Sequence, residues 1–560
     1  EWPGGVVPQD GQSVVIPGDW VIKLDVNTAS LGLLHVLGDL HFDAEQPDLV
    51  LTAQRIWVEG QIFIGNSSEE RYESNAKILL TGVRKSPSLI IGEFQDVSNK
   101  VLAVTGNLTM YGAEVNNAFV RLQASAQVGD TSITVPNTVD WKVGDEIFIA
   151  PTQRLSKEYE THTITAISGG VITLASKIKY YHFGASTVTK QTSYGVLDMR
   201  AEVGLLTRNI KIQGSDEDYW GGRLYVGEVY NSTYDTYYRG RVDIDGVEFI
   251  NCGQANTTLA GVTLERLVSD TNDASVIRKS VLRDSTGYNL RVVGSNGFTF
   301  EDNIVYKGYK YQVVFEESGS DIQFLNNLIV GTNDRGLKAD KGDMAFDYTV
   351  NLFADVQFEN SLFSGNIIAG CDQTCVFMPG SSCTGDKHFV NNVVHSGETG
   401  WVMRAKNTQC TAASKLVGYK LEDALVSFFA TQSIQASNLV ISDCAIGCSL
   451  NIGKITADTT VSITDSYFAG LSLVDYAGAY TNKTECSALS GIMIPVSLVA
   501  EKSVPPSPSS LPWHKVKSDA IFKASTTVSS VTFENFKDGL VTDCKGNYAF
   551  ESNPYASDKS

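Results

Sequence analysis

The sequence predicts an all-β protein with an N-terminal β domain, a small inserted β barrel or sandwich, and a long right-handed parallel β-helix. Composition is one reason: 49 glycines, 23 tyrosines and 24 phenylalanines accompany few helix-favouring runs, which is typical of many short strands and turns. A repeat is the other. Residues 277–282, 300–305 and 324–329 align on Ser280, Asn303 and Asn327, at steps of 23 and 24 residues.

Similar units recur at residues 358–363, 389–394 and 463–468. In each unit a polar residue, often Asn, separates two short apolar runs. In a parallel β-helix the apolar side chains stack inside, and Asn side chains form a ladder by bonding backbone groups of adjacent coils. A β-sandwich would also show short alternating strands, but the near-constant period favours the solenoid.

The other segments are placed by their local pattern. Alternation in residues 20–25 predicts strands with one face in a core, and the Ser168-Gly169-Gly170 turn predicts a hairpin. The expected organisation is a β domain over 1–113, a β insertion over 114–195, β-helix repeats over 196–500, a Pro-rich linker over 501–514, and a C-terminal β segment over 515–560 that continues beyond the chain.

Two segments resemble a known family. Residues 199–214 (MRAEVGLLTRNIKIQG), followed by Trp220-Gly221-Gly222, resemble the junction segment of fibrocystin, fibrocystin-like proteins and the cell-surface hyaluronidases. The pattern P-x-x-G-x-x-V-x-I-P over residues 8–17 is similar to the G8 ("G-eight") domain of that family. The resemblance implies a G8 domain followed by β-helix repeats, in a family that includes both structural ectodomains and polysaccharide-cutting enzymes.

In the junction segment three charged residues alternate with apolar ones. The charged residues are Arg200, Glu202 and Arg208. Burying an unpaired charge costs several kcal/mol. We therefore expect each of these side chains to have a partner.

Composition excludes some classes of partner. The net charge is −19 and the chain has no lysine or arginine cluster, which argues against nucleic acid as a partner. The sequence contains no apolar run of about 18 residues, so it predicts no membrane span. Five N-x-S/T sequons, at Asn66, Asn107, Asn231, Asn256 and Asn482, together with the resemblance predict a secreted or cell-surface glycoprotein whose signal peptide has been removed.

The nine cysteines are unevenly placed. Eight follow residue 370, namely Cys371, Cys375, Cys383, Cys410, Cys444, Cys448, Cys486 and Cys544. They predict up to four disulfides in an oxidising compartment, with Cys252 as the free thiol. The C-x-x-x-C spacing is one residue longer than the common zinc motif, so a metal site is the weaker interpretation.

Paired carboxylates are the first catalytic candidates. Glu316 and Glu317 could serve as general acid and base in glycoside cleavage, where one carboxyl must be protonated and the other ionised. The alternative is a solvated turn between two coils.

A second acidic group offers oxygen ligands. Asp340, Asp343 and Asp347 suit Ca²⁺ or a sugar, although their spacing is not that of an EF-hand, and Asp340 and Asp343 are also weak catalytic candidates. The alternative is a charged loop. Lys338 with Arg335 is a weaker candidate for a lyase base. Tyr306, Tyr309 and Tyr311 beside Lys307 and Lys310 are candidate aromatics for glycan contact.

The histidine motif that the resemblance would bring is absent. Residues 260–267 replace it without a histidine, and the seven histidines of the chain form no H-x-H or H-x-x-x-H pair. This difference argues against an enzyme.

Three functions remain in contention. The first is a glycosylated structural or adhesive ectodomain that assembles with itself or other extracellular proteins at a cell or ciliary surface. The alternatives are a hyaluronan-type depolymerase that uses acidic residues, and a calcium-assisted carbohydrate-binding module. No cofactor other than Ca²⁺ is expected.

Overall fold

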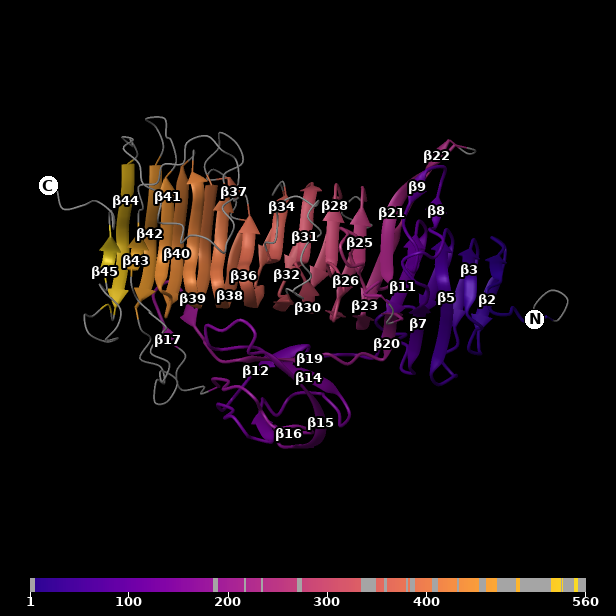
Figure 1. Ribbon diagram of the computed structural model, residues 1–560, viewed down its shortest axis with the longest axis horizontal. Helices are drawn as coiled ribbons and strands as arrows, with labels where there is room; N and C mark the ends of the chain where they lie inside the picture. Colours follow the sequence, from indigo (N-terminus) through magenta and orange to yellow (C-terminus); the bar gives the residue numbers. More distant parts are fainter. Residues whose placement is uncertain are drawn as a thin grey trace.

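The protein is an elongated, all-β solenoid with a smaller β unit packed along one side (Figure 1). The computed structural model describes residues 6–184, 190–215, 218–232, 235–268, 274–333, 349–356, 360–378, 381–382, 388–404, 411–430, 433–452, 460–470, 490–493, 525–534, 536 and 548–551. Within them no helix is long and apolar enough to cross a bilayer.

The solenoid has three parallel faces, which we call the first, second and third sheets. The first sheet stacks, in order, β1 (Ser13–Ile16), β3 (Leu31–Val36), the end of β5 (Leu49–Val58), β10 (Val101–Val104), β21 (Arg223–Asn231), β25 (Val262–Glu265), β28 (Leu290–Val293), β31 (Tyr311–Ser318), β34 (Val350–Val356), the ends of β36 (Ile367–Met378), β38 (Phe389–Arg404) and β39 (Thr411–Ala430), then β41 (Ile446–Ile452), β43 (Ser490–Met493) and β45 (Tyr548–Glu551).

The second sheet stacks β2 (Val21–Leu24), β4 (Asp39–Phe42), β6 (Gln61–Ile64), β11 (Asn107–Tyr111), β23 (Arg241–Asp245), β26 (Ser275–Arg278), β29 (Phe298–Glu301), β32 (Ile322–Leu325) and β35 (Leu362–Ser364), then the starts of β38, β39, β40 (Ile434–Ser442), β42 (Thr460–Ala469) and β44 (Ser525–Glu534).

The third sheet stacks the start of β5, then β7 (Ala76–Leu80), β20 (Ile210–Gly214), β24 (Val247–Ile250), β27 (Val281–Arg283), β30 (Ile304–Tyr309) and β33 (Leu328–Asn333), followed by the start of β36, the middle of β38 and β39, and the ends of β40, β42 and β44. Two short pairs project near the N-terminal end: β8 (Ile90–Ile91) with β9 (Gln95–Asp96), and β22 (Thr236–Arg239) with the end of β21 (Figure 1). β37 (Ser381–Ser382) pairs antiparallel with β39.

The N-terminal segment and the β-helix repeats are structurally continuous. β10 pairs directly with β21, and β7 with β20, so residues 13–111 form the first coils of the same solenoid. Alternating short strands look the same in a separate β domain and in a coil, because both bury one face of each strand.

The small inserted β unit is confirmed, with different limits. Its six-stranded antiparallel sheet contains β12 (Phe119–Arg121), β13 (Ser132–Thr134), β14 (Glu146–Ile149), β15 (Glu160–Ser168), β16 (Val171–Leu174) and β19 (Glu202–Leu205), and β17 (Lys190–Gln191) pairs with β18 (Val196–Leu197). The predicted hairpin at Gly169-Gly170 joins β15 and β16. The solenoid resumes at Ile210, so β18 and β19 belong to the insertion and not to the repeats.

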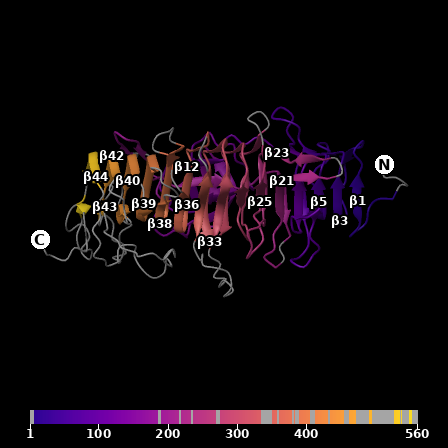
Figure 2. The same ribbon diagram turned by 90° about the horizontal axis from the view of Figure 1, so that it is seen from above.

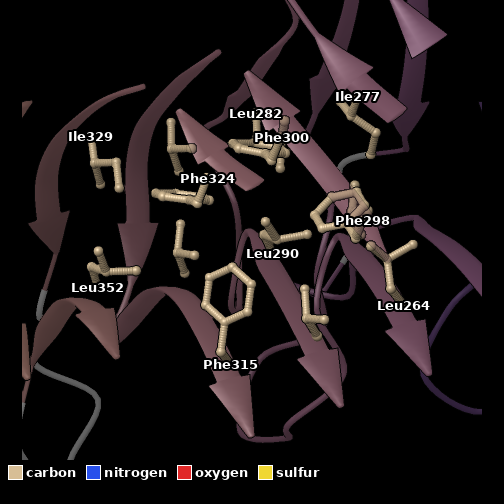
Figure 3. Packing of buried hydrophobic residues seen from close by; sticks show 14 of the residues in the cluster. Leu264, Ile277, Leu282, Leu290, Phe298, Phe300, Phe315, Phe324, Ile329 and Leu352 are labelled. Carbon is tan, nitrogen blue, oxygen red and sulfur yellow. The ribbon is translucent and has the colours of Figure 1, made fainter. Parts of the chain in front are cut away.

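The solenoid core is a continuous stack of apolar side chains (Figure 3). Phe300 and Phe324 stack at 5.3 Å with ring planes 4° apart, and Phe324 contacts Phe315 and Phe363 from neighbouring strands. Each ring is buried. This interlocking explains why the apolar positions of the repeat carry bulky residues.

The predicted asparagine ladder is present. The Oδ1 atoms of Asn303, Asn327, Asn366 and Asn392 each accept from the backbone N–H of the preceding ladder residue, at 2.9–3.0 Å. Their Nδ2 atoms donate to the carbonyls of Ile277, Phe300, Phe324 and Phe363, at 2.9–3.0 Å. Ser466 continues the pattern as the hydroxyl acceptor for Leu439 N–H, at 3.1 Å.

The predicted repeat unit at residues 358–363 was misaligned. On that coil the ladder residue is Asn366, so the segment equivalent to 324–329 is 363–368. Ser361 instead accepts the backbone N–H of Ile322 at an earlier bend. The proposed linker over 501–514 lies outside the described residues, whereas β44 adds a further coil on β42.

The insertion packs along the third sheet. Phe148 stacks on Tyr306 at 4.3 Å, and buried residues of β27, β30, β33 and β36 join the insertion's own core. Ion pairs connect it to separate coils along the solenoid: Glu146 to Arg283 at 2.8 Å, Lys157 to Asp372 at 3.3 Å, and Lys190 to Glu534 at 2.6 Å. Figure 1 places the insertion beneath the middle of the solenoid and β17 near its C-terminal coils, and Figure 2, seen from above, shows β12 beside the middle coils.

Candidate functional site

The carboxylates proposed at the end of β31 do not form an acid–base pair. Glu316 lies on the outer face of the first sheet, and its Oε2 is 3.0 Å from Arg291 Nε on the preceding coil. Glu317 is the exposed bend residue that follows, with φ of 48°. Arg291 neutralises one carboxylate and solvent surrounds the other, so nothing here holds one carboxyl protonated beside an ionised partner.

Asp340, Asp343 and Asp347, with Lys338 and Arg335, lie outside the described residues. Within the described ranges, no group of three or more His, Cys, Asp or Glu residues is arranged to hold a metal.

The tyrosine group is mainly structural. Tyr306 is fully buried, and its hydroxyl lies 2.9 Å from Thr161 Oγ1 of the insertion. Tyr309 is 3% exposed, and Tyr311 is half-buried. Tyr306 therefore joins the insertion to the third sheet and is not available to a glycan.

An acidic row that the sequence did not reveal lies where the third sheet turns into the first. Cys371, Gly397 and Leu421 are in register on β36, β38 and β39. The residues that follow them, Asp372, Glu398 and Glu422, therefore occupy the same bend on three successive coils. Asp423 comes next, and Lys157 of the insertion pairs with Asp372 beside the row.

Asp423 has the most perturbed environment in this row. It is 8% exposed, and its Oδ1 has no hydrogen-bond partner. Desolvation raises its pKa to about 7, reinforced by Glu422 and Glu398 and opposed by Arg154. The pKa of Glu398 is also raised to about 7, first by desolvation, but its side chain is exposed, so solvent screening weakens this effect.

The row can hold a proton near neutral pH, which is a property of many general acids. However, the carboxyl with the strongest shift is buried, so a polymer cannot reach it in this structure. The immediate consequence is for stability.

We expect the protein to lose stability as the pH rises from about 4 to 7, with Asp423 as one cause. Over this range the folded chain retains a proton that the unfolded chain releases, because the pKa of Asp423 is raised from 3.8 to about 7 on folding. The cost above pH 7 is on the order of 4 kcal/mol. The difference between the melting temperatures at pH 5 and pH 8 should be smaller in Asp423→Asn than in the unmodified protein. An unchanged pH dependence would contradict this assignment.

Two buried groups, each built around histidine and glutamate, bring together residues that are distant in the sequence. His395 Nε2 lies 3.2 Å from Glu202 Oε2, its Nδ1 lies 3.0 Å from Ser396 Oγ, and all three side chains are fully buried. Ser396 Oγ also donates to the Pro151 carbonyl at 3.1 Å. Although this resembles a catalytic triad in composition, the hydroxyl is engaged and enclosed, so it is no nucleophile.

Glu202 also fulfils the expectation that the junction charges are paired. Its Oε1 lies 2.9 Å from Arg121 Nη2. The two groups form an ion pair, but their angles do not meet the criteria for a hydrogen bond. Arg200 pairs with Asp198 at 2.6 Å, and Arg208 donates to three backbone carbonyls.

The second histidine group lies inside the insertion. Glu160 accepts from Lys179 N–H and Tyr180 N–H, and its two oxygens lie 2.8 Å from His162 Nε2 and 3.0 Å from His182 Nε2. These contacts lower the pKa of Glu160 despite desolvation. The group is buried and braces the small sheet.

Five of the nine cysteines lie in the described part of the chain, and two of them form a disulfide. Cys371 and Cys375 form a disulfide, and Cys252 is a buried free thiol, as expected. Cys444 and Cys448 are also free and buried, so their assignment to disulfides is wrong: both pack in the solenoid core, where desolvation raises the pKa of Cys444 to about 12. Cys383, Cys410, Cys486 and Cys544 lie outside the described residues.

Comparison with known proteins agrees with the resemblance. Residues 1–123 match the G8 domain. Mouse fibrocystin is 25% identical over 568 residues, covering 97% of this chain. The N-terminal part of the chain is therefore identified as a G8 domain. Human fibrocystin-L is 24% identical over 465 residues, covering 78% of the chain, and the Dictyostelium discoideum communication mutant protein F is 24% identical over 325 residues, covering 56%.

This chain spans only part of those relatives: 13% of mouse fibrocystin, 11% of human fibrocystin-L and 27% of communication mutant protein F. Among solved structures, the periplasmic alginate epimerase AlgG aligns at 10% identity and a TM-score of 0.26, covering 93% of this chain and 84% of that one. The catalytic domain of a GH87 α-1,3-glucanase aligns at 9% identity and a TM-score of 0.26, covering 79% and 98%. Similarity this low carries no argument about activity.

Proposed function

We propose that this chain is a structural or adhesive segment of an extracellular, glycosylated β-helix ectodomain that takes part in assembly at a cell or ciliary surface. The observation that carries this proposal is the way in which the polar groups of the described chain are used. Ladder asparagines, buried histidines and most buried acids hold coils and the insertion together, and Arg291 neutralises the candidate Glu316.

The insertion supports the same proposal. It contacts the third sheet from the coil of Arg283 to that of Glu534, so it resists bending and separation of those coils. A solenoid has only nearest-neighbour contacts along its axis, and a lateral brace adds contacts between distant coils. A rigid rod of this kind suits a load-bearing or adhesive segment. The fibrocystin relatives support the extracellular location.

The proposal predicts that the purified chain does not shorten polysaccharides. The assay is size-exclusion chromatography of hyaluronan and a panel of acidic polysaccharides after incubation, with and without Ca²⁺, and a bacterial hyaluronidase as positive control. Light scattering on the protein should show a concentration-dependent assembly. Polymer shortening that is lost in Glu316→Gln or Asp423→Asn would overturn the structural proposal and place an active site on these acids.

A further inference from the structure

An open cleft lies on the outer face of the second sheet, near the N-terminal end of the solenoid. It is lined by His41, Phe63, Asn66, Glu70, Arg71 and Tyr72, among others. His41 on β4 and Phe63 on β6 are register partners, and their rings stack at 4.5 Å with planes 13° apart. Both side chains are half-buried, so the cleft has an aromatic wall that solvent reaches.

The loop after β6 forms the other wall and holds Asn66 in place. Asn66 N–H donates to the Glu70 carbonyl at 2.9 Å, and Asn66 Nδ2 donates to Glu70 Oε2 at 2.9 Å. Ser67 Oγ accepts from the backbone N–H groups of Glu69 and Glu70. Gly65 has φ of 78°, and a Cβ there would lie 2.5 Å from the Tyr111 carbonyl oxygen, so the loop can pass so close to β11 only with glycine.

Asn66 is the exposed first residue of an Asn66-Ser67-Ser68 sequon, so a covalent ligand can be attached at the lip of the cleft. We propose that Asn66 carries an N-linked glycan whose first sugars lie in this cleft against His41 and Phe63. This inference rests on the proposed extracellular function, because N-glycans are added in the secretory pathway.

The chemistry of the cleft suits such a glycan. The C–H face of a pyranose ring is apolar and packs on aromatic rings, while its hydroxyl and N-acetyl groups need hydrogen-bond partners. Glu70 supplies an exposed carboxylate, and Asn66 Nδ2 retains one N–H after glycosylation with which to keep its bond to Glu70. The Arg71 side chain at the cleft donates to both Asp245 carboxylate oxygens and to the Gly112 carbonyl, so its position is fixed.

Two other sequons provide comparisons. Asn107 lies within β11 and is half-buried. Its register partners on the two neighbouring strands are Gln61 and Arg241, so its side chain has residues on both sides along the sheet. Asn256 is exposed in a turn with φ of 59° and does not line this cleft. Asn256 is therefore the matched control for a glycan free in solvent.

The test uses the full chain secreted from a mammalian cell line, with glycopeptide mass spectrometry and digestion by an amidase that removes N-glycans. In the native protein the Asn66 glycan should be released on the order of tenfold more slowly than the Asn256 glycan, the factor expected when a stacking contact must first open. Denaturation should equalise the rates. Phe63→Ala, on the solvent side of β6, should accelerate release at Asn66 alone, and His41→Ala provides a second variant if Phe63→Ala fails to fold.

Different failures have different meanings. Occupancy at Asn256 with Asn66 unmodified, or equal native release rates at both sites, would overturn the docked glycan and leave the extracellular function standing. Secretion with no glycan at either asparagine would overturn this inference and weaken the proposed function. Retention of the unmodified chain in the cytosol would overturn both.

Discussion

Replacing Glu202 with alanine is expected to destabilise the protein by about 3–5 kcal/mol, the usual cost of removing one partner of a buried ion pair. Glu202 is fully buried between Arg121 on the insertion and His395 on the third sheet. Its loss leaves the Arg121 charge enclosed without its closest anion. Thermal denaturation and hydrogen exchange of β14 and β19 should show the insertion loosening before the solenoid.

A surface ion pair is the control. Arg239 pairs with Glu228 at 2.7 Å, but the Arg239 side chain is 59% exposed, so Arg239→Ala should cost under about 1 kcal/mol. The double variant Arg121→Met/Glu202→Leu should recover most of the stability, because it removes both charges from the interior. A Glu202→Ala variant as stable as Arg239→Ala would show that the contact with the insertion does not depend on this group.

Asn327→Ala is expected to have the second large effect, about 2–6 kcal/mol. The substitution removes the acceptor for Asn303 N–H and the donor to the Phe300 carbonyl, both inside the solenoid. Each buried group left without a partner costs about 1–3 kcal/mol. The loss should be measured as a lower melting temperature, together with faster hydrogen exchange at residues 300–304 and 325–329.

Gln323→Ala is the matched control, because Gln323 lies on the preceding strand with its amide donating to the Asn360 carbonyl at the surface. That variant should change stability by less than about 0.5 kcal/mol. Equal effects of Asn327→Ala and Gln323→Ala would mean that the ladder contributes little beyond ordinary packing.

Much of the solenoid could be predicted from local pattern. Ser280, Asn303 and Asn327 recur at nearly constant steps because the ladder needs a small polar residue at the same bend of every coil. The misalignment at residues 358–363 has a physical cause as well. The chain between β33 and β35 is longer than on other coils, and both Ser361 and Asn366 serve as inward acceptors there.

The site was less predictable. Asp372, Glu398 and Glu422 are about 25 residues apart, and nothing in one stretch of sequence marks them as neighbours until the register of β36, β38 and β39 is known. Likewise His162 and His182 come together on Glu160 from separate segments. By contrast, adjacent carboxylates such as Glu316 and Glu317 attract attention in the sequence, but one is paired and the other marks a bend.

Local sequence was sufficient to predict the all-β class, the repeat, the polar ladder and the resemblance to G8-domain proteins, because each depends on residues close together along the chain. Tertiary structure alone decided that residues 13–111 belong to the same solenoid, that Tyr306 is covered by the insertion, and that Glu202 meets His395. These contacts arise from the stacking of coils and from a unit folded back on the third sheet. Such long-range contacts depend on register and docking, which periodicity does not encode.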